Sequence, residues 1–153
     1  MKDEEQKQTK KKGTMVTPYK NVKNGDIRNH VDKLEIFATK KRKEINDNSS
    51  VFSSLKIIYS HSLSIDSHSL IQTRQVQYVV YSYGEHFPMY VYNYDAGVWL
   101  GNSDKYSRTT SKHQSISRPS QGIHEWYSTI ELRRIVDYGY IQIITKRLEG
   151  AYG

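Results

Sequence analysis

Cysteine is absent from the 153 residues of this chain. Its absence excludes disulfides, thiolate catalysis, and zinc or iron–sulfur sites held by cysteine. The sequence also has no apolar run close to the roughly 18 residues of a membrane span, and its charged N-terminus lacks the apolar core of a signal peptide. We therefore expect a soluble, cytoplasmic protein without a membrane partner.

Acidic residues are in the minority, at 16 against 23 lysines and arginines, which leaves a net charge of +7. A basic balance favours an anionic partner, and nucleic acid is the commonest one for a small protein of this kind. The cations are concentrated in residues 20–45 and 104–119. A basic surface that does no more than keep the protein soluble is the alternative.

The N-terminal residues have little to bury. Residues 1–13 hold five lysines and three acidic residues, and Met1 is their one apolar side chain, so burial cannot offset the entropy lost on ordering them. We predict that residues 1–24 form a disordered basic tail and that residues 25–153 form a single domain.

Two segments have the pattern of a helix. Apolar residues recur near every 3.6 positions over residues 26–45, where Asp26 is a suitable N-cap, and four consecutive cations end the segment. The sequence Ser128-x-x-Glu131 predicts a capping box for a second helix, which Gly139 would end.

Strand-like runs fill most of the remaining sequence. Residues 51–60 are rich in β-branched and aromatic side chains, and residues 74–84, 88–94 and 98–99 predict a three-stranded antiparallel meander joined by short turns. Residues 123–127 predict a short strand, and residues 140–146 are compatible with a last one. The expected fold is α+β: an antiparallel sheet of about four to six strands, with that central meander and with two helices on one face.

A polar tract, DKYSRTTSKHQSISRP at residues 104–119, interrupts this strand-rich region. We predict an ordered loop that binds an anion, because tryptophans flank it and because ordered loops of this length are usually functional. Its candidate ligands carry charge, hydroxyl groups or a ring: Lys105, Tyr106, Ser107, Arg108, Thr109, Thr110, Ser111, Lys112, His113 and Arg118. The tract has no glycine pattern of a P-loop and no carboxylate beyond Asp104, so magnesium-dependent nucleotide hydrolysis is disfavoured.

Alternating tyrosines at Tyr90, Tyr92 and Tyr94 share one face of a predicted strand. Such a row either stacks nucleic-acid bases or packs against the helices, and we favour packing for at least part of it. His61 and His68 are a weak candidate for a metal pair, so we predict no metal site and no cofactor.

The segments YVVYSYGEHFPMYVYNYDAGVW and NSDKYSRTTSKHQS, followed by RP, resemble a family of small uncharacterised proteins of bacteriophages, plasmids and bacterial mobile elements. The resemblance covers about residues 76–119, and Leu100 departs from the aromatic residue of the family pattern. It implies a phage or mobile-element setting in a bacterial host cell and brings no biochemical activity. The matching positions are Tyr83, Gly84, His86, Pro88, Trp99, Asn102, Lys105, Tyr106, Ser107, Thr109, Thr110, Ser111, Lys112, His113, Ser115 and Pro119.

Three functions compete. The leading hypothesis is a non-enzymatic accessory protein that binds nucleic acid or a host nucleoprotein complex through residues 104–119. The second is an anti-defence inhibitor that binds a host protein through the tyrosine face, because tyrosine is enriched at interface hot spots. The third is a metal-independent nuclease or phosphotransferase in which His86 and His113 act as acid and base and Lys112 or Arg108 stabilises charge on phosphorus.

Overall fold

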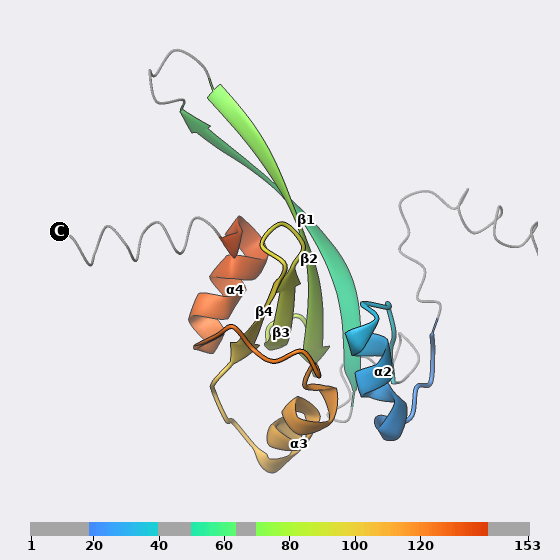
Figure 1. Cartoon of the computed structure of the whole chain (residues 1–153). Coiled ribbons are helices and arrows are strands. Elements are labelled where there is room, and N and C mark those ends of the chain that lie inside the picture. Colours follow the sequence, from blue (N-terminus) through green and yellow to red (C-terminus); the bar gives the residue numbers. More distant parts are fainter. Residues whose placement is uncertain (1–18, 40–49, 64–69, 141–153) are drawn as a thin grey trace, which may run out of the picture.

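The computed structural model of the chain describes residues 19–39, 50–63 and 70–140. Five strands form one sheet in the order β1-β2-β3-β4-β5 (Figure 1). Together with the helices they confirm the predicted α+β fold. The strands are β1 (Val51–Leu63), β2 (Leu70–Ser82), β3 (Pro88–Asn93), β4 (Val98–Asn102) and β5 (Glu125–Tyr127).

The predicted meander is confirmed as β2, β3 and β4, which pair antiparallel in sequence order. β1 adds a further antiparallel strand along the whole of β2, from Val51 opposite Ser82 to Leu63 opposite Leu70. β5 differs from the prediction because it lies parallel to β4. A parallel pair needs a crossover connection, and the chain between Asn102 and Glu125 supplies it.

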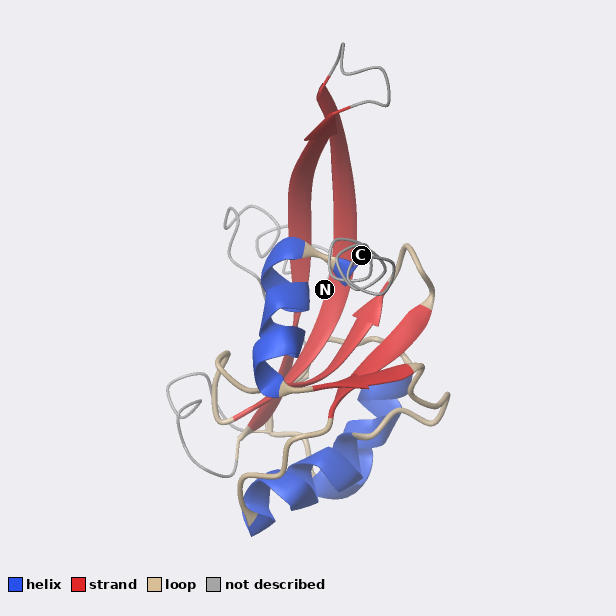
Figure 2. Cartoon of the chain, turned by 90° about the vertical axis from the view of Figure 1, so that its left-hand side faces the viewer, coloured by secondary structure: helices blue, strands red, loops and turns tan. Residues whose placement is uncertain are grey.

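β1 and β2 continue well past β3, which pairs with residues 77–81 of β2. Their far ends therefore form a two-stranded arm that projects from the sheet (Figures 1 and 2). Leu55, Ile57 and Tyr59 alternate along β1 toward the arm and are 37%, 51% and 60% exposed. Because alternate residues of a strand point to the same face, these three side chains form one apolar row.

The helix expected over residues 26–45 is much shorter. A 3-10 turn, η1 (Asn24–Asp26), leads into α2 (Ile27–Asp32), and the side chain of Asp26 makes no capping bond. The helix ends because Leu34 takes a left-handed conformation (φ 57°). The Leu34 and Glu35 amides then donate to the carbonyls of Val31 and His30, which is the bond pattern of a Schellman motif.

Beyond that stop the chain becomes extended. Phe37 bridges to Tyr19, and Ala38 bridges to Phe52 at the start of β1. Tyr19 therefore belongs to the folded part, although it lies inside the predicted tail of residues 1–24. Residues 1–18, the four cations at 40–43 and the possible last strand after Tyr140 lie outside the described residues.

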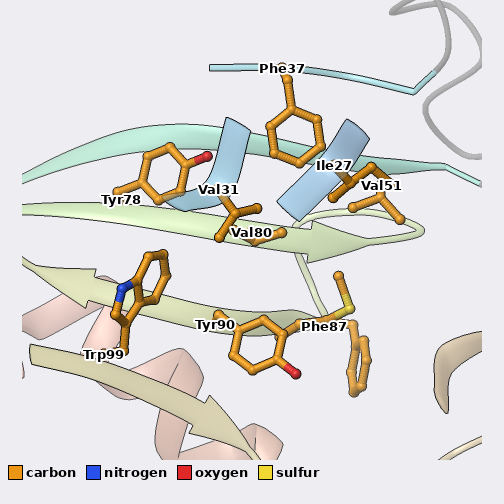
Figure 3. Close-up of a cluster of buried hydrophobic side chains, with 10 residues drawn as sticks. Ile27, Val31, Phe37, Val51, Tyr78, Val80, Phe87, Tyr90 and Trp99 are labelled. Carbon is orange, nitrogen blue, oxygen red and sulfur yellow. The ribbon is translucent and has the colours of Figure 1, made fainter. Parts of the chain in front are cut away.

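The helices cover both faces of the sheet, which corrects the expectation that they share one. On one face, Ile27 and Val31 of α2 pack with Phe37 over Tyr78, Val80 and Trp99 of the sheet (Figure 3). On the other face, Leu132, Ile135 and Val136 of α4 (Thr129–Tyr138) pack over Val79, Tyr81, Val91 and Leu100. Figure 2 shows α4 in front of the sheet.

The predicted second helix is confirmed as α4. Ser128 accepts a bond from the Glu131 amide, and the Glu131 carboxylate accepts one from the Ser128 amide, as the capping box requires. Gly139 ends the helix at φ 101°, a conformation that favours glycine.

A third helix replaces the predicted loop. Within residues 104–119, the segment α3 (Arg108–Ser117) is helical and forms the crossover between β4 and β5. It lies across the end of the sheet where β2 and β4 finish (Figure 1). The polar tract is thus a packed element of the fold.

Candidate nucleic-acid interface

The inward side of α3 is polar. Thr110, His113, Gln114 and Ser117 are its buried residues, and their spacing of three, one and three positions places them on one side of a helix. Ser107 caps the helix by accepting a bond from the Thr110 amide at 3.1 Å. Arg118 is extended and precedes Pro119, which cannot continue the helix.

Gln114 holds the start of the tract against β4. Its Nε2 donates to the carbonyls of Asn102 and Asp104, both at 3.0 Å, and its Oε1 accepts from Lys105 Nζ at 3.3 Å. The Gln114 carbonyl accepts from the hydroxyl of Tyr90 at 2.6 Å. A buried amide with this many partners fixes the position of the helix as apolar packing would.

His113 is also part of the packing. It is 5% exposed, and its Nδ1 shares a 2.6 Å hydrogen bond with Ser82 Oγ at the end of β2. Burial in the first place, and the charge of Lys112 in the second, lower the pKa of His113 from its usual 6.5. The imidazole is therefore neutral in the folded protein at neutral pH.

The outward side of α3 is basic. Arg108 and Lys112 are exposed and lie four residues apart, so they share one side of the helix, and the exposed Lys105 precedes them. Among the described residues none of these three cations forms an ion pair. α3 thus separates its side chains, with neutral polar groups inward and unpaired cations outward.

The ten predicted anion ligands do not form one cluster. Thr110 and His113 are buried, Ser111 is half-buried and Thr109 is exposed. Arg118 lies at the opposite end of α3, where its guanidinium stacks over Trp126 at 5.3 Å. A helix of ten residues is about 15 Å long, so Arg118 is remote from Ser107.

A pocket of about 500 Å³ opens beside the start of α3. It brings together the connection between β2 and β3, the residues before α3 and the first turns of α4. Among the described residues that line it, Arg133 is the one lysine or arginine and no carboxylate is present. The lining residues are Tyr83, His86, Phe87, Tyr106, Ser107, Thr110, Thr129, Ile130 and Arg133.

A smaller pocket of about 200 Å³ adjoins it and shares His86 and Arg133. This second space also has Lys56, Glu85 and Asp137 in its lining. Two carboxylates among these cations make it a poorer site for an anion than the larger pocket.

Tyr106 presents a fixed ring at the larger pocket. Its side chain is 65% exposed, but its hydroxyl donates to Thr129 Oγ1 at 3.1 Å and lies 3.4 Å from Asp104 Oδ2. The ring also contacts Phe87, with the centroids 5.1 Å apart. The Asp104 carboxylate accepts from the Thr129 amide at 2.8 Å, and this bond is the main reason that its pKa is lowered.

Tyr83 forms another part of the wall. Its backbone is left-handed (φ 72°), which is uncommon for a bulky residue and is found most often where the surrounding structure holds it in place. Its hydroxyl lies 3.5 Å from Ser107 Oγ, and the hydroxyls of Ser107, Thr110 and Thr109 lower its pKa. The phenol therefore sits over the start of α3 with hydroxyl groups around it.

The three tyrosines at and just after β3 have different environments. Tyr90 is 2% exposed and belongs to the core, Tyr92 is half-buried against Trp99, and Tyr94 is 41% exposed. Of the two roles considered for this row, packing therefore describes Tyr90. Tyr94 lies on the same face as the apolar row of β1, because its amide bonds to Val76, the partner of Ile57.

The two histidines proposed as acid and base are not equivalent. His86 is exposed and lines both pockets, whereas His113 is buried and lines neither. The geometry does not favour His113 as a group that exchanges protons with a substrate. The side chain of His61 and the whole of His68 lie outside the described residues, and within the described ones no three His, Asp or Glu side chains form a metal-binding group.

Sequence reasoning missed Arg133, Ile130 and Thr129 as site residues because they belong to α4, far from the tract in sequence. It also missed α3 itself. Two local signals point to that helix: Ser107 is a good N-cap, and Pro119 follows the last turn at a typical distance.

The helices of the described segments are all too short and too polar to cross a membrane. None of the protein families, curated proteins or solved structures compared with the chain matches it.

Proposed function

We propose that this protein binds nucleic acid, alone or within a host nucleoprotein complex, through the outward side of α3 and the pocket beside it. The observation that supports this most directly is that the polar tract separates buried neutral side chains from exposed cations. Its neutral polar groups are used inside the fold, while Lys105, Arg108 and Lys112 face solvent without an ion pair among the described residues. Unpaired cations on one surface are what a phosphate backbone requires.

The proposed setting is that of a non-enzymatic accessory protein of a bacteriophage or mobile element, in the cytoplasm of a bacterial host. The setting is proposed from the resemblance of residues 76–119 to proteins of that kind. The buried and hydrogen-bonded state of His113 supports binding over a reaction that uses both histidines.

The test is fluorescence anisotropy with labelled single-stranded and duplex DNA and RNA over a series of salt concentrations. Arg108→Gln/Lys112→Gln removes the two cations of α3 that have no structural bond, and Lys105 is kept because it binds Gln114. We expect weaker binding and a slope of log K against log salt that is shallower by about 1.4 for single strands, since each phosphate contact contributes about 0.7.

The matched control is Lys33→Gln/Arg74→Gln, which changes the net charge equally at exposed positions of the turn after α2 and of β2. Its slope should stay close to that of the wild type. Absence of binding to every probe at low salt would refute the proposed function, and equal losses in the two double variants would refute the assignment to α3.

Binding of a host protein is the second candidate, and one observation favours it. Leu55, Ile57 and Tyr59 of β1 and Tyr94 just after β3 are exposed on one side of the sheet, and large exposed apolar groups that lie together mark interaction surfaces. Affinity purification from host lysate, with and without nuclease, separates the two functions. A protein partner should still co-purify after nuclease treatment and should no longer co-purify with the Ile57→Asp variant.

A further inference from the structure

The larger pocket joins a flat aromatic surface to a cation and hydroxyl groups. Its volume of about 500 Å³ lies within the range of small-molecule sites, and its lining is mostly apolar and aromatic with a few polar groups. We propose that this pocket binds one unpaired nucleotide of single-stranded nucleic acid, with the base on the Tyr106 ring and the phosphate at Arg133 and His86. The proposal rests on the nucleic-acid binding proposed above and adds a preference for single strands.

Tyr106 is suited to stacking because it is exposed and already ordered. A solvent-facing side chain ordinarily loses rotamer freedom when it is bound, which weakens the interaction. Here the hydroxyl bond to Thr129 and the contact with Phe87 hold the ring before any ligand arrives, and 65% of the side chain stays open. A base that stacks on it therefore loses little affinity to ordering.

Ile130 provides an apolar neighbour for the same base. It belongs to the first turn of α4, is 69% exposed, and follows Thr129, to which Tyr106 is bonded. At this exposure Ile130 buries little of its surface in the fold. Beside a fixed ring it becomes apolar surface that a base can cover.

The charge in the pocket suits a phosphate. Arg133 lies one turn after Ile130 on α4, so the two side chains are neighbours on the helix surface. Within the described residues its guanidinium makes no ion pair. The Asp104 carboxylate, 3.4 Å from the Tyr106 hydroxyl, is not among the lining residues and accepts the first amide of α4, so it opposes an incoming anion less than a free carboxylate would.

An unpaired nucleotide fits this arrangement better than a duplex does. The faces of bases inside a duplex are covered by their neighbours, whereas an unpaired base exposes a face on which an aromatic ring can stack without selecting the sequence. Arg108 directly follows Ser107 of the pocket lining, and Lys112 lies four residues further along α3, so a strand whose base occupies the pocket can continue along these two cations. A duplex can use those cations but not the ring.

The experiment measures anisotropy with a labelled oligothymidylate of about a dozen nucleotides, a length typical of single-strand sites, and with a duplex of equal length. Tyr106→Leu should weaken single-strand binding by about five- to hundredfold, the loss of one stacked base, and leave duplex binding unchanged. Arg133→Gln should also weaken single-strand binding. Tyr106→Phe keeps the ring and should remain within about threefold of the wild type.

Each variant has a matched control. Tyr59→Leu removes an equally exposed tyrosine from the arm, and Arg134→Gln removes the neighbouring arginine of α4 that does not line the pocket. Circular dichroism reports whether Tyr106→Leu is folded. Ile130→Asp tests the pocket independently, since an acid is well tolerated in the first turn of a helix, and Tyr59→Asp is its control for charge.

Two outcomes overturn the proposal and are distinguishable. If the wild type binds both probes with salt dependence and neither Tyr106→Leu nor Ile130→Asp differs from its control, the pocket proposal fails and the proposed function stands. If the wild type binds neither probe at low salt, the proposed function fails and the pocket proposal fails with it. Selective loss of single-strand binding in both variants supports the proposal.

Discussion

Gln114 allows a direct test of whether the polar tract is a packed part of the fold. The substitution Gln114→Leu keeps a side chain of similar size and removes the amide. Two donated bonds of 3.0 Å are lost, and the carbonyls of Asn102 and Asp104 lose a donor inside the protein. Each lost bond costs about 1 kcal/mol, the unpaired carbonyls add to this cost, and burial of the leucine offsets part of it. The free energy of unfolding should therefore fall by about 2–3 kcal/mol.

The measurement is urea unfolding followed by tryptophan fluorescence and circular dichroism. Trp99 is 3% exposed, so its emission reports the loss of the core. For a chain of this length, the expected loss lowers the melting temperature by about 4–12 °C. Ser115→Ala is the control, because Ser115 is exposed on the same helix and uses its backbone carbonyl, not its side chain, to accept a bond from Arg28.

Gln114→Glu sharpens the test. Its carboxylate would face two carbonyl oxygens without a proton to donate, so it should be less stable than Gln114→Leu at neutral pH and should recover partly on acidification, when protonation restores one donor. If Gln114→Leu unfolds within about 0.5 kcal/mol of the wild type, the amide is not buried between α3 and β4, and the sorting of side chains that supports the proposed function is wrong.

Three further predictions concern other parts of the same architecture. The pKa of His113 is lowered in the folded protein, so below about pH 6.5 the unfolded chain binds more protons than the folded one. The free energy of unfolding should therefore fall as the pH falls from about 6.5 to the pKa of the folded state. In His113→Gln, this part of the pH dependence of the urea midpoint should disappear. Tyr90→Phe should cost about 1 kcal/mol of stability, because the buried carbonyl of Gln114 loses its donor. Its affinity for nucleic acid, measured by anisotropy, should be unchanged. A loss of affinity in the folded variant would mean that Tyr90 contacts the nucleic acid. Gly139→Ala should cost about 1–3 kcal/mol in thermal unfolding, since its φ is 101° and an added Cβ would lie 3.0 Å from the Gln75 side chain; a neutral result would mean that the end of α4 is placed differently.

The sheet could be predicted from the sequence because its strands are rich in β-branched and aromatic residues and short turns join the strands of the meander. The same reasoning overextended the first helix. The apolar spacing over residues 26–45 continues past Leu34, but the chain turns at that residue and carries Phe37 into the core. The spacing of apolar residues does not show where the chain must leave a helix to pack against a distant part of the fold.

The sequence predicted a loop over residues 104–119, whereas most of this tract forms the helix α3. A search for apolar periodicity cannot find α3, because the periodic buried residues are Thr110, His113, Gln114 and Ser117. The side chains of His113 and Gln114 bond to Ser82 Oγ and to the carbonyls of Asn102 and Asp104, which become neighbours only after folding. Arg133 could not be assigned for the same reason, since α4 brings it to the pocket from outside the tract.

The parallel pairing of β4 and β5 has a consequence for how this protein can change in evolution. α3 is the connection that carries the chain from the end of β4 back to the start of β5, and β5 leads at once into the Ser128 cap of α4. An insertion or deletion inside residues 108–117 would rotate the inward residues away from their partners and move β5 out of register. We therefore expect related chains to vary the outward residues of α3 freely and to keep its length constant.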